Sequence, residues 1–142
     1  MGATLPPEVL AAGEGAAERV ELESPPGPAS SIARLVLGGI ADCLRLGVDE
    51  LDDLQLAVER LLAEARGPER VRLAFEWTDQ TLRTYVGPLP EQPIAAALEA
   101  SERARGELDL RRVLETLVDS VAIEQVSGDG LVVRLEKHVP RP

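Results

Sequence analysis

Charged residues that could do chemistry lie along one ridge of a predicted helix between Asp49 and Arg66. Apolar residues recur there at the i, i+3, i+4 and i+7 spacing of a helix with one buried face, namely Leu51, Leu54, Val58, Leu61, Leu62 and Ala65. Beside that face, one ridge carries Asp53, Ala57, Arg60 and Glu64. Arg60 and Glu64 are spaced for a surface ion pair, which contributes about 0.2–0.5 kcal/mol. A second interpretation is that Arg60 binds a phosphate.

The other reactive side chains in the sequence lack the neighbours that their chemistry requires. His138 is the one histidine, with no nearby cysteine or histidine, so we expect a solvated side chain and no metal site. Ser101 and Ser127 lack the histidine and acid that nucleophilic catalysis needs. The single cysteine, Cys43, follows an apolar helical pattern and is predicted to be buried in the core. The acidic group Asp49, Glu50, Asp52 and Asp53 suits the positive end of a helix dipole without a metal.

The elements that would position this helix predict a single α+β domain, with residues 1–17 as a flexible tail and residues 18–139 as the domain. Strands are expected at Arg19–Ser24, Arg70–Thr78, Thr81–Val86, Ala122–Val126 and Leu131–Lys137. Helices are expected at Ala29–Leu46, Asp49–Arg66, Pro93–Arg103 and Leu108–Ser120. The main order is β-α-α-β-β-α-β-β. We therefore predict a two-layer sandwich in which helices cover one face of a mixed, mostly antiparallel sheet.

Finer expectations concern the first helix and the central hairpin. Ser30 or Ser31 is predicted to cap the first helix, and Gly47 to end it. Its buried side is predicted to be Ile32, Leu35, Val36, Gly39, Ile40, Cys43 and Leu44. The glycine pair Gly38–Gly39 in its middle costs about 1 kcal/mol per residue relative to alanine, and such a pair is typical of close approach by another backbone. Phe75 and Trp77 are predicted to lie in the core on one strand face.

Composition narrows the possible partners. The chain of 142 residues has a formal charge of −10, which argues against nucleic acid and against an anionic membrane surface. The charge favours a basic protein partner. Aromatic residues are 2% of the chain, so the core must be aliphatic. No signal peptide or membrane span is recognisable, and the chain is expected to be cytoplasmic.

The ridge resembles the helix that holds the catalytic carboxylate and the metal-binding asparagine in the anti-sigma-factor serine kinases of the GHKL (Bergerat, histidine-kinase-like) ATPase superfamily. That family's pattern reads roughly D-x-x-L-A-V-x-E-x-x-x-N. The matching residues here are Asp53, Leu56, Ala57 and Val58. The resemblance spans about Val20 to Val139, including the first segment VELESPPGPASSIARLVLGGIADCLRLG and the final VLETLVDSVAIEQVSGDGLVVRLEK. It implies the Bergerat fold.

The departures from the family pattern imply a degenerate nucleotide site. Arg60 stands at the glutamate position and Glu64 at the asparagine position. The adenine-reading Asp-x-Gly turn is replaced by Val86-Gly87-Pro88-Leu89. The glycine-rich phosphate loop is reduced to Gly106, followed by the carboxylates Glu107 and Asp109. The segment from Gly87 to Gly106 is also short for a nucleotide lid. A third interpretation of Arg60 follows, in which it fills the vacated pocket and pairs with Asp109 or Glu107.

The resemblance therefore implies a non-catalytic, anti-sigma-factor-like regulator that acts through protein binding. Its partner would be a sigma factor or an anti-anti-sigma factor, and it could form a homodimer through the first strand and helix, Ala29–Leu46. No cofactor is expected. One alternative is an active ATP-dependent serine kinase that uses Mg-ATP at an atypical site, with Glu59 as the acid. The other is a structural or interaction domain that shares only the fold.

Overall fold

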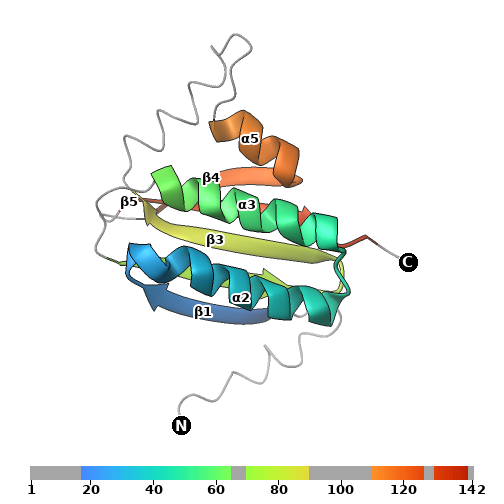
Figure 1. Cartoon of the computed structure of the whole chain (residues 1–142). Coiled ribbons are helices and arrows are strands. Elements are labelled where there is room, and N and C mark those ends of the chain that lie inside the picture. The colour runs from blue at the N-terminus through green and yellow to red at the C-terminus, as the bar shows by residue number, and fades with distance from the viewer. Residues whose placement is uncertain (1–16, 65–69, 90–109, 127–129, 141–142) are drawn as a thin grey trace.

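The computed structural model describes residues 17–64, 70–89, 110–126 and 130–140, and the following statements concern these residues. Three helices lie on one face of a five-stranded sheet (Figure 1). The elements are β1 (Glu18–Ser24), α2 (Pro26–Leu44), α3 (Val48–Glu64), β2 (Val71–Trp77), β3 (Thr81–Leu89), α5 (Leu110–Leu117), β4 (Ser120–Val126) and β5 (Gly130–His138). The predicted α+β class and the element order are confirmed. The predicted helix Pro93–Arg103 and residues 1–16 of the predicted tail lie outside the described residues.

The sheet has the strand order β1-β2-β3-β5-β4, and every neighbouring pair is antiparallel. Local signals explain the β2–β3 hairpin, since the backbone amides of Gln80 and Thr81 donate to the Thr78 hydroxyl at 3.1 and 3.2 Å. Strands β4 and β5 are likewise consecutive in the chain, whereas the other two pairs, β1 with β2 and β3 with β5, join strands that are separated in sequence. The sheet is thus antiparallel throughout its described part rather than mixed.

The core lies between this sheet and the helices. Alternate strand residues point toward the helices, as in β2, where Val71, Leu73 and Phe75 are fully buried. The helices contribute aliphatic side chains to the same cluster, namely Ala33, Leu37, Leu54, Val58, Leu61, Leu110 and Leu114. Trp77 is partly buried against it. The aliphatic core and the placement of Phe75 were predicted correctly.

Helix α2 differs from its prediction at both ends. It begins at Pro26, because a proline at the first helical positions has its φ preset for the helix and lacks only an amide that would be unbonded anyway. Pro25 is the N-cap and makes no side-chain capping bond, so the predicted serine cap is wrong. At the other end Arg45 takes the left-handed conformation, with φ 58°, where Gly47 was expected to end the helix.

The buried side of α2 also differs from the prediction. The residues Ala29, Ala33, Leu37, Ile40 and Ala41 face the core. Cys43 is exposed and Leu35 is 78% exposed, so their predicted burial is wrong. The helix carries two apolar stripes at helical spacing, and the stripe with the smaller alanine side chains packs against the sheet.

Candidate functional site

The ridge on α3 lies on the side of that helix that is turned away from α2. Gln55 faces α2, because its side-chain amide donates to the Arg34 carbonyl oxygen at 3.1 Å. Asp53 is two residues away, about 200° around the helix, and so faces the opposite side. Its carboxylate lies 3.8 Å from the Lys137 Nζ of β5. Ala57 on the same ridge is fully buried, and Arg60 is half-buried.

Lys137 joins three elements at one end of this ridge. Its Nζ donates a hydrogen bond of 2.8 Å to the carbonyl oxygen of Leu117, the last residue of α5. A cation is favourable there, since the C-terminal carbonyls of a helix carry partial negative charge. The side chain is only 12% exposed and also meets Asp53 of α3. Sequence reasoning missed Lys137 because these contacts join residues far apart in the chain.

Glu59, the acid of the alternative kinase reading, faces α2 rather than the ridge. Its carboxylate forms an ion pair with Arg34, whose other nitrogen donates to the Gln55 amide oxygen at 3.0 Å. Gln55 is only 5% exposed. These three side chains fasten α2 to α3, which gives Glu59 a structural role away from Asp53 and Ala57.

One of the predicted site residues, Gly87, is not brought together with the ridge. Gly87 lies on the opposite face of the sheet, where an added Cβ would stand 2.8 Å from both the Leu131 carbonyl oxygen and a methyl group of Val132. Close packing between β3 and β5 therefore requires glycine there, and grouping Gly87 with a helix-side pocket was wrong. Gly106, Glu107, Asp109 and the side chain of Glu64 lie outside the described residues. Their proximity to Arg60 remains a prediction.

Thr84 is a buried hydroxyl on the helix side of β3. It is fully buried between Phe75 and Leu135, its partners across the sheet, which are also fully buried. Its Oγ1 has no hydrogen-bond partner among the described residues. A buried hydroxyl without a partner costs free energy, because its hydration is not replaced.

We expect the Thr84→Val variant to raise the free energy of unfolding by about 1 kcal/mol, because the methyl group removes this desolvation cost. Urea denaturation followed by the fluorescence of Trp77, the only tryptophan, measures the change. The matched control is Thr78→Val, which we expect to destabilise the fold because the Thr78 hydroxyl accepts two backbone amides. A loss of stability in Thr84→Val comparable to that in Thr78→Val would show that the Thr84 hydroxyl has a partner.

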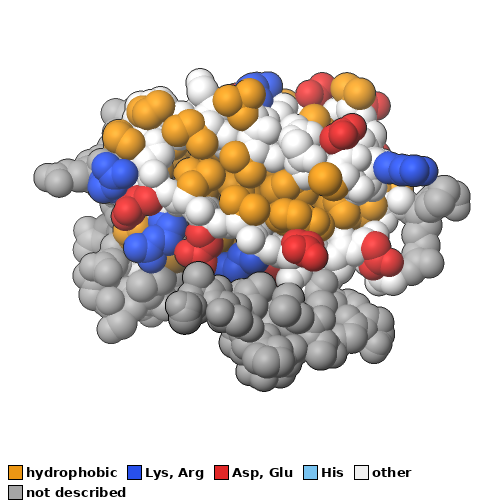
Figure 2. All heavy atoms as spheres, turned by 90° about the horizontal axis from the view of Figure 1, so that it is seen from below, with side chains coloured by type: hydrophobic (Ala, Val, Ile, Leu, Met, Phe, Trp, Pro, Cys, Tyr) orange, Lys and Arg blue, Asp and Glu red, His pale blue; other side chains and the backbone are white. Residues whose placement is uncertain are grey.

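An apolar surface runs along β1 and the outer side of α2, and we call it the β1–α2 surface (Figure 2). Its exposed hydrophobic residues are Val20 at 38% and Leu35 at 78%. The half-buried residues Leu22, Ile32 and Val36 continue it, with the exposed Cys43 near its end. An added Cβ at Gly38 or Gly39 would meet nothing within 4 Å. The close approach predicted for this glycine pair is therefore not made by the described part of the chain.

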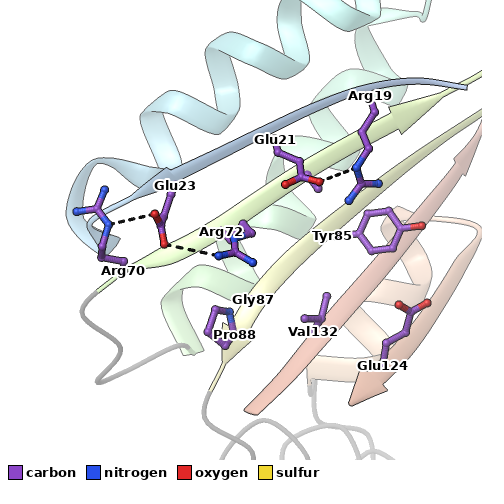
Figure 3. A pocket seen from close by; sticks show the side chains of 11 residues that line it. Arg19, Glu21, Glu23, Arg70, Arg72, Tyr85, Gly87, Pro88, Glu124 and Val132 are labelled. Atoms are coloured by element: carbon purple, nitrogen blue, oxygen red, sulfur yellow. Dashed lines mark hydrogen bonds and ion pairs between the residues drawn. The ribbon is translucent and has the colours of Figure 1, made fainter. Parts of the chain in front are cut away.

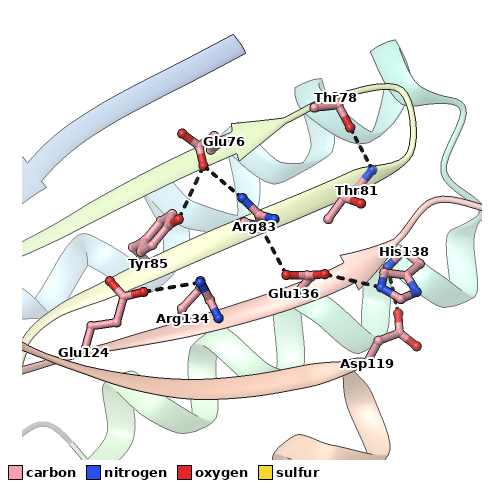
Figure 4. A network of polar contacts seen from close by, with 10 residues as sticks. All are labelled: Glu76, Thr78, Thr81, Arg83, Tyr85, Asp119, Glu124, Arg134, Glu136 and His138. Carbon is pink, nitrogen blue, oxygen red and sulfur yellow. Dashed lines mark hydrogen bonds and ion pairs between the residues drawn. The ribbon is translucent and has the colours of Figure 1, made fainter. Parts of the chain in front are cut away.

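The other face of the sheet, which the described helices leave uncovered, is the open face, and it carries alternating arginine and glutamate side chains (Figure 4). Glu76 lies 3.4 Å from Arg19 Nη1 and 3.7 Å from Arg83 Nη1. Arg83 Nε donates to Glu136 at 3.1 Å. The Tyr85 hydroxyl donates to Glu76 at 3.3 Å, and the Arg19 guanidinium lies 5.4 Å from the Tyr85 ring centre. Opposite charges thus neighbour one another across the strands, which stabilises cross-strand pairing.

These contacts shift the pKa values of three side chains of the open face, Arg19, Arg83 and Tyr85. The hydrogen bond to Glu21 raises the pKa of Arg19, and the hydrogen bond to Glu136 raises the pKa of Arg83. Burial, and then the neighbouring Glu76, raise the pKa of the Tyr85 phenol. Both guanidiniums therefore stay charged and the phenol stays neutral at physiological pH.

Comparison with known proteins gives no family assignment. A scan against models of known protein families finds no match to the sequence, and a search of curated protein sequences finds none either. Within the described ranges, no group of three or more histidine, cysteine, aspartate or glutamate side chains is placed to hold a metal ion. No helix in the part of the chain that the structure describes is long and apolar enough to cross a membrane.

Proposed function

We propose that this chain is a non-catalytic relative of the anti-sigma-factor serine kinases, a cytoplasmic regulator that acts by binding another protein. The observation that carries the proposal is the pairing of a helix-covered sheet of order β1-β2-β3-β5-β4 with the α3 ridge of Asp53, Ala57 and Arg60. This arrangement supports a Bergerat-type fold that keeps the helix of the nucleotide site. A sigma factor or an anti-anti-sigma factor is the proposed class of partner.

The chemistry of the ridge argues against phosphoryl transfer. Such catalysis needs a carboxylate or equivalent group that orients the nucleophile, and side-chain ligands that hold magnesium on the phosphates. The guanidinium of Arg60 can do neither, and Glu59 is engaged with Arg34. Ala57 is completely buried, and Lys137 occupies the space beside Asp53. Retention of the scaffold without these groups favours a binding role over a kinase role.

The β1–α2 surface is the proposed protein-binding face, and a second copy of the chain fits it. Strand β1 is at the edge of the described sheet, where unpaired backbone groups are a template for another strand. If two copies of β1 pair antiparallel about Glu21, then Arg19 lies opposite Glu23 of the other copy, and Val20 lies opposite Leu22. Glu21 meets its own copy, but each Glu21 accepts a 2.8 Å hydrogen bond from Arg19. Both charge and hydrophobicity are therefore complementary in this register.

A titration with nucleotide tests the degenerate site. We expect no change in Tm and no calorimetric heat with Mg-ATP or Mg-ADP up to millimolar concentration, because the ligands for magnesium and adenine are replaced. A nucleotide present at one hundred times its Kd would stabilise the fold by about 2.7 kcal/mol. Magnesium tripolyphosphate is the matched control for the effect of charge. A shift of several degrees with Mg-ATP, absent with tripolyphosphate, would contradict the proposal and direct attention to kinase activity.

A further inference from the structure

The open face contains a hollow of ≈ 590 Å³ that no step of the proposed function uses (Figure 3). Its floor is formed by short or apolar side chains, Ala74 of β2, Gly87 and Pro88 of β3 and Val132 of β5. Tyr85 of β3 stands at one side of this floor. Arginine and glutamate side chains form the remaining walls. A concave site with an apolar floor and a few convergent polar groups has the general form of a ligand site, and its volume suits a small ligand or a few peptide residues.

The arginines of the open face fall into two groups. Arg19, Arg83 and Arg134 each have a carboxylate partner at 2.8 to 3.3 Å. Arg70 and Arg72 share one carboxylate, Glu23, at 3.7 and 3.9 Å, which is beyond hydrogen-bonding distance. Their side chains are 52% and 64% exposed. The N–H groups of these two arginines therefore do not donate hydrogen bonds to Glu23.

The two arginines lie at the end of the hollow where Gly87 and Pro88 form the floor (Figure 3). A guanidinium is a planar fork of N–H donors that matches a carboxylate. A ligand with a carboxylate at this end would place its remaining atoms over Gly87, Val132 and Ala74.

We propose that this hollow binds a short acidic peptide segment of a partner protein. One carboxylate of the segment accepts from the N–H groups of Arg70 and Arg72 that Glu23 does not engage, and a small apolar side chain of the segment covers the floor. The net charge of −10 does not prevent this, because arginine and glutamate side chains balance on the open face. The arginines are Arg19, Arg70, Arg72, Arg83 and Arg134, and the glutamates are Glu21, Glu23, Glu76, Glu124 and Glu136. Charges elsewhere are screened beyond about 8 Å at physiological ionic strength.

The test is an NMR titration of the ¹⁵N-labelled full chain with the peptide acetyl-AEVEA-amide. We expect amide shifts concentrated at Ala74, Gly87 and Val132. Arg70→Gln and Arg72→Gln should each weaken binding roughly tenfold, the effect of losing one charge-assisted hydrogen bond. Both side chains are more than half exposed, so the fold should be unchanged. Arg83→Gln is the matched control: it removes the same charge from the same face outside the hollow, and should change Kd by less than about twofold.

Several results would overturn the peptide site. These are an absence of shifts at millimolar peptide, an equal loss in Arg83→Gln, and equal binding of acetyl-AKVKA-amide. Inorganic phosphate producing the same shifts at the same concentration would also overturn it, because the apolar floor would then contribute nothing. None of these results depends on whether nucleotide binds beside α3.

Discussion

The Leu35→Glu variant is expected to be monomeric under conditions in which the unsubstituted chain is a dimer. Leu35 is 78% exposed in the protomer, so the substitution should not disturb folding. In the proposed dimer through the β1–α2 surface, two copies of this side chain would be buried, and burial of each would contribute about 1.5–3 kcal/mol. A charged replacement at both positions should weaken self-association by roughly a hundredfold or more. Sedimentation velocity at several protein concentrations measures the mass relative to the 15.2 kDa protomer.

The matched control for this experiment is Leu56→Glu. Leu56 is 51% exposed on α3, outside the β1–α2 surface, and the same change of charge there should leave the dimer intact. Equal dissociation by both variants would indicate a general effect of added negative charge. A chain that is monomeric at high micromolar concentration before any substitution would refute the dimer outright.

The proposed antiparallel register of the two β1 strands can be tested separately by exchanging charges. Arg19→Glu alone places a carboxylate opposite Glu23 of the other copy, twice in each dimer, and should weaken the dimer. The double variant Arg19→Glu with Glu23→Arg exchanges the two charges and should recover part of this loss. Recovery is partial because Arg19 also pairs with Glu21 within the chain, and Glu23 with Arg70 and Arg72. A double variant no better than the single variant would exclude antiparallel pairing about Glu21, whatever the oligomeric state.

The sequence was sufficient for the elements whose signals are local. In strands β2 and β5 every second residue is apolar over Val71–Trp77 and Leu131–Leu135, and each strand occurs within a residue or two of its predicted bounds. Helix α3 has one apolar stripe, so its buried face followed from spacing alone. Helix α2 has two such stripes, and spacing cannot choose between them. Which stripe is buried depends on the sheet beneath the helix. The other apolar stripe is exposed and forms part of the β1–α2 surface.

The candidate site was predictable only where it lies on a single element. The ridge of Asp53, Ala57 and Arg60 followed from helical periodicity. Lys137 could not be found, because its role depends on β5 ending beside both α3 and α5. The error over Gly87 has the same origin: the sequence placed it after a strand, but β3 continues to Leu89, and alternation turns Gly87 toward the open face.

Phe75→Ala should be the most destabilising single substitution that we consider. Phe75 is the only phenylalanine, is fully buried, and lies on β2 between Val20 of β1 and Thr84 of β3. Truncating a buried phenylalanine removes its transfer free energy and leaves a cavity, at a cost of about 3–5 kcal/mol. The cavity would lie in the middle of the sheet, where neighbouring strands cannot move inward without breaking their hydrogen-bonded register.

Urea unfolding monitored by Trp77 fluorescence measures this loss, with Leu56→Ala as the control. Leu56 is half exposed, so its truncation should change the free energy of unfolding by no more than about 0.5 kcal/mol. A small loss in Phe75→Ala would mean that the core between the sheet and the helices adjusts easily. It would then be doubtful that the sheet holds the α3 ridge and the open face in fixed positions. A loss of several kcal/mol with an unchanged m-value would instead show that Phe75 stabilises the folded state without altering the surface exposed on unfolding.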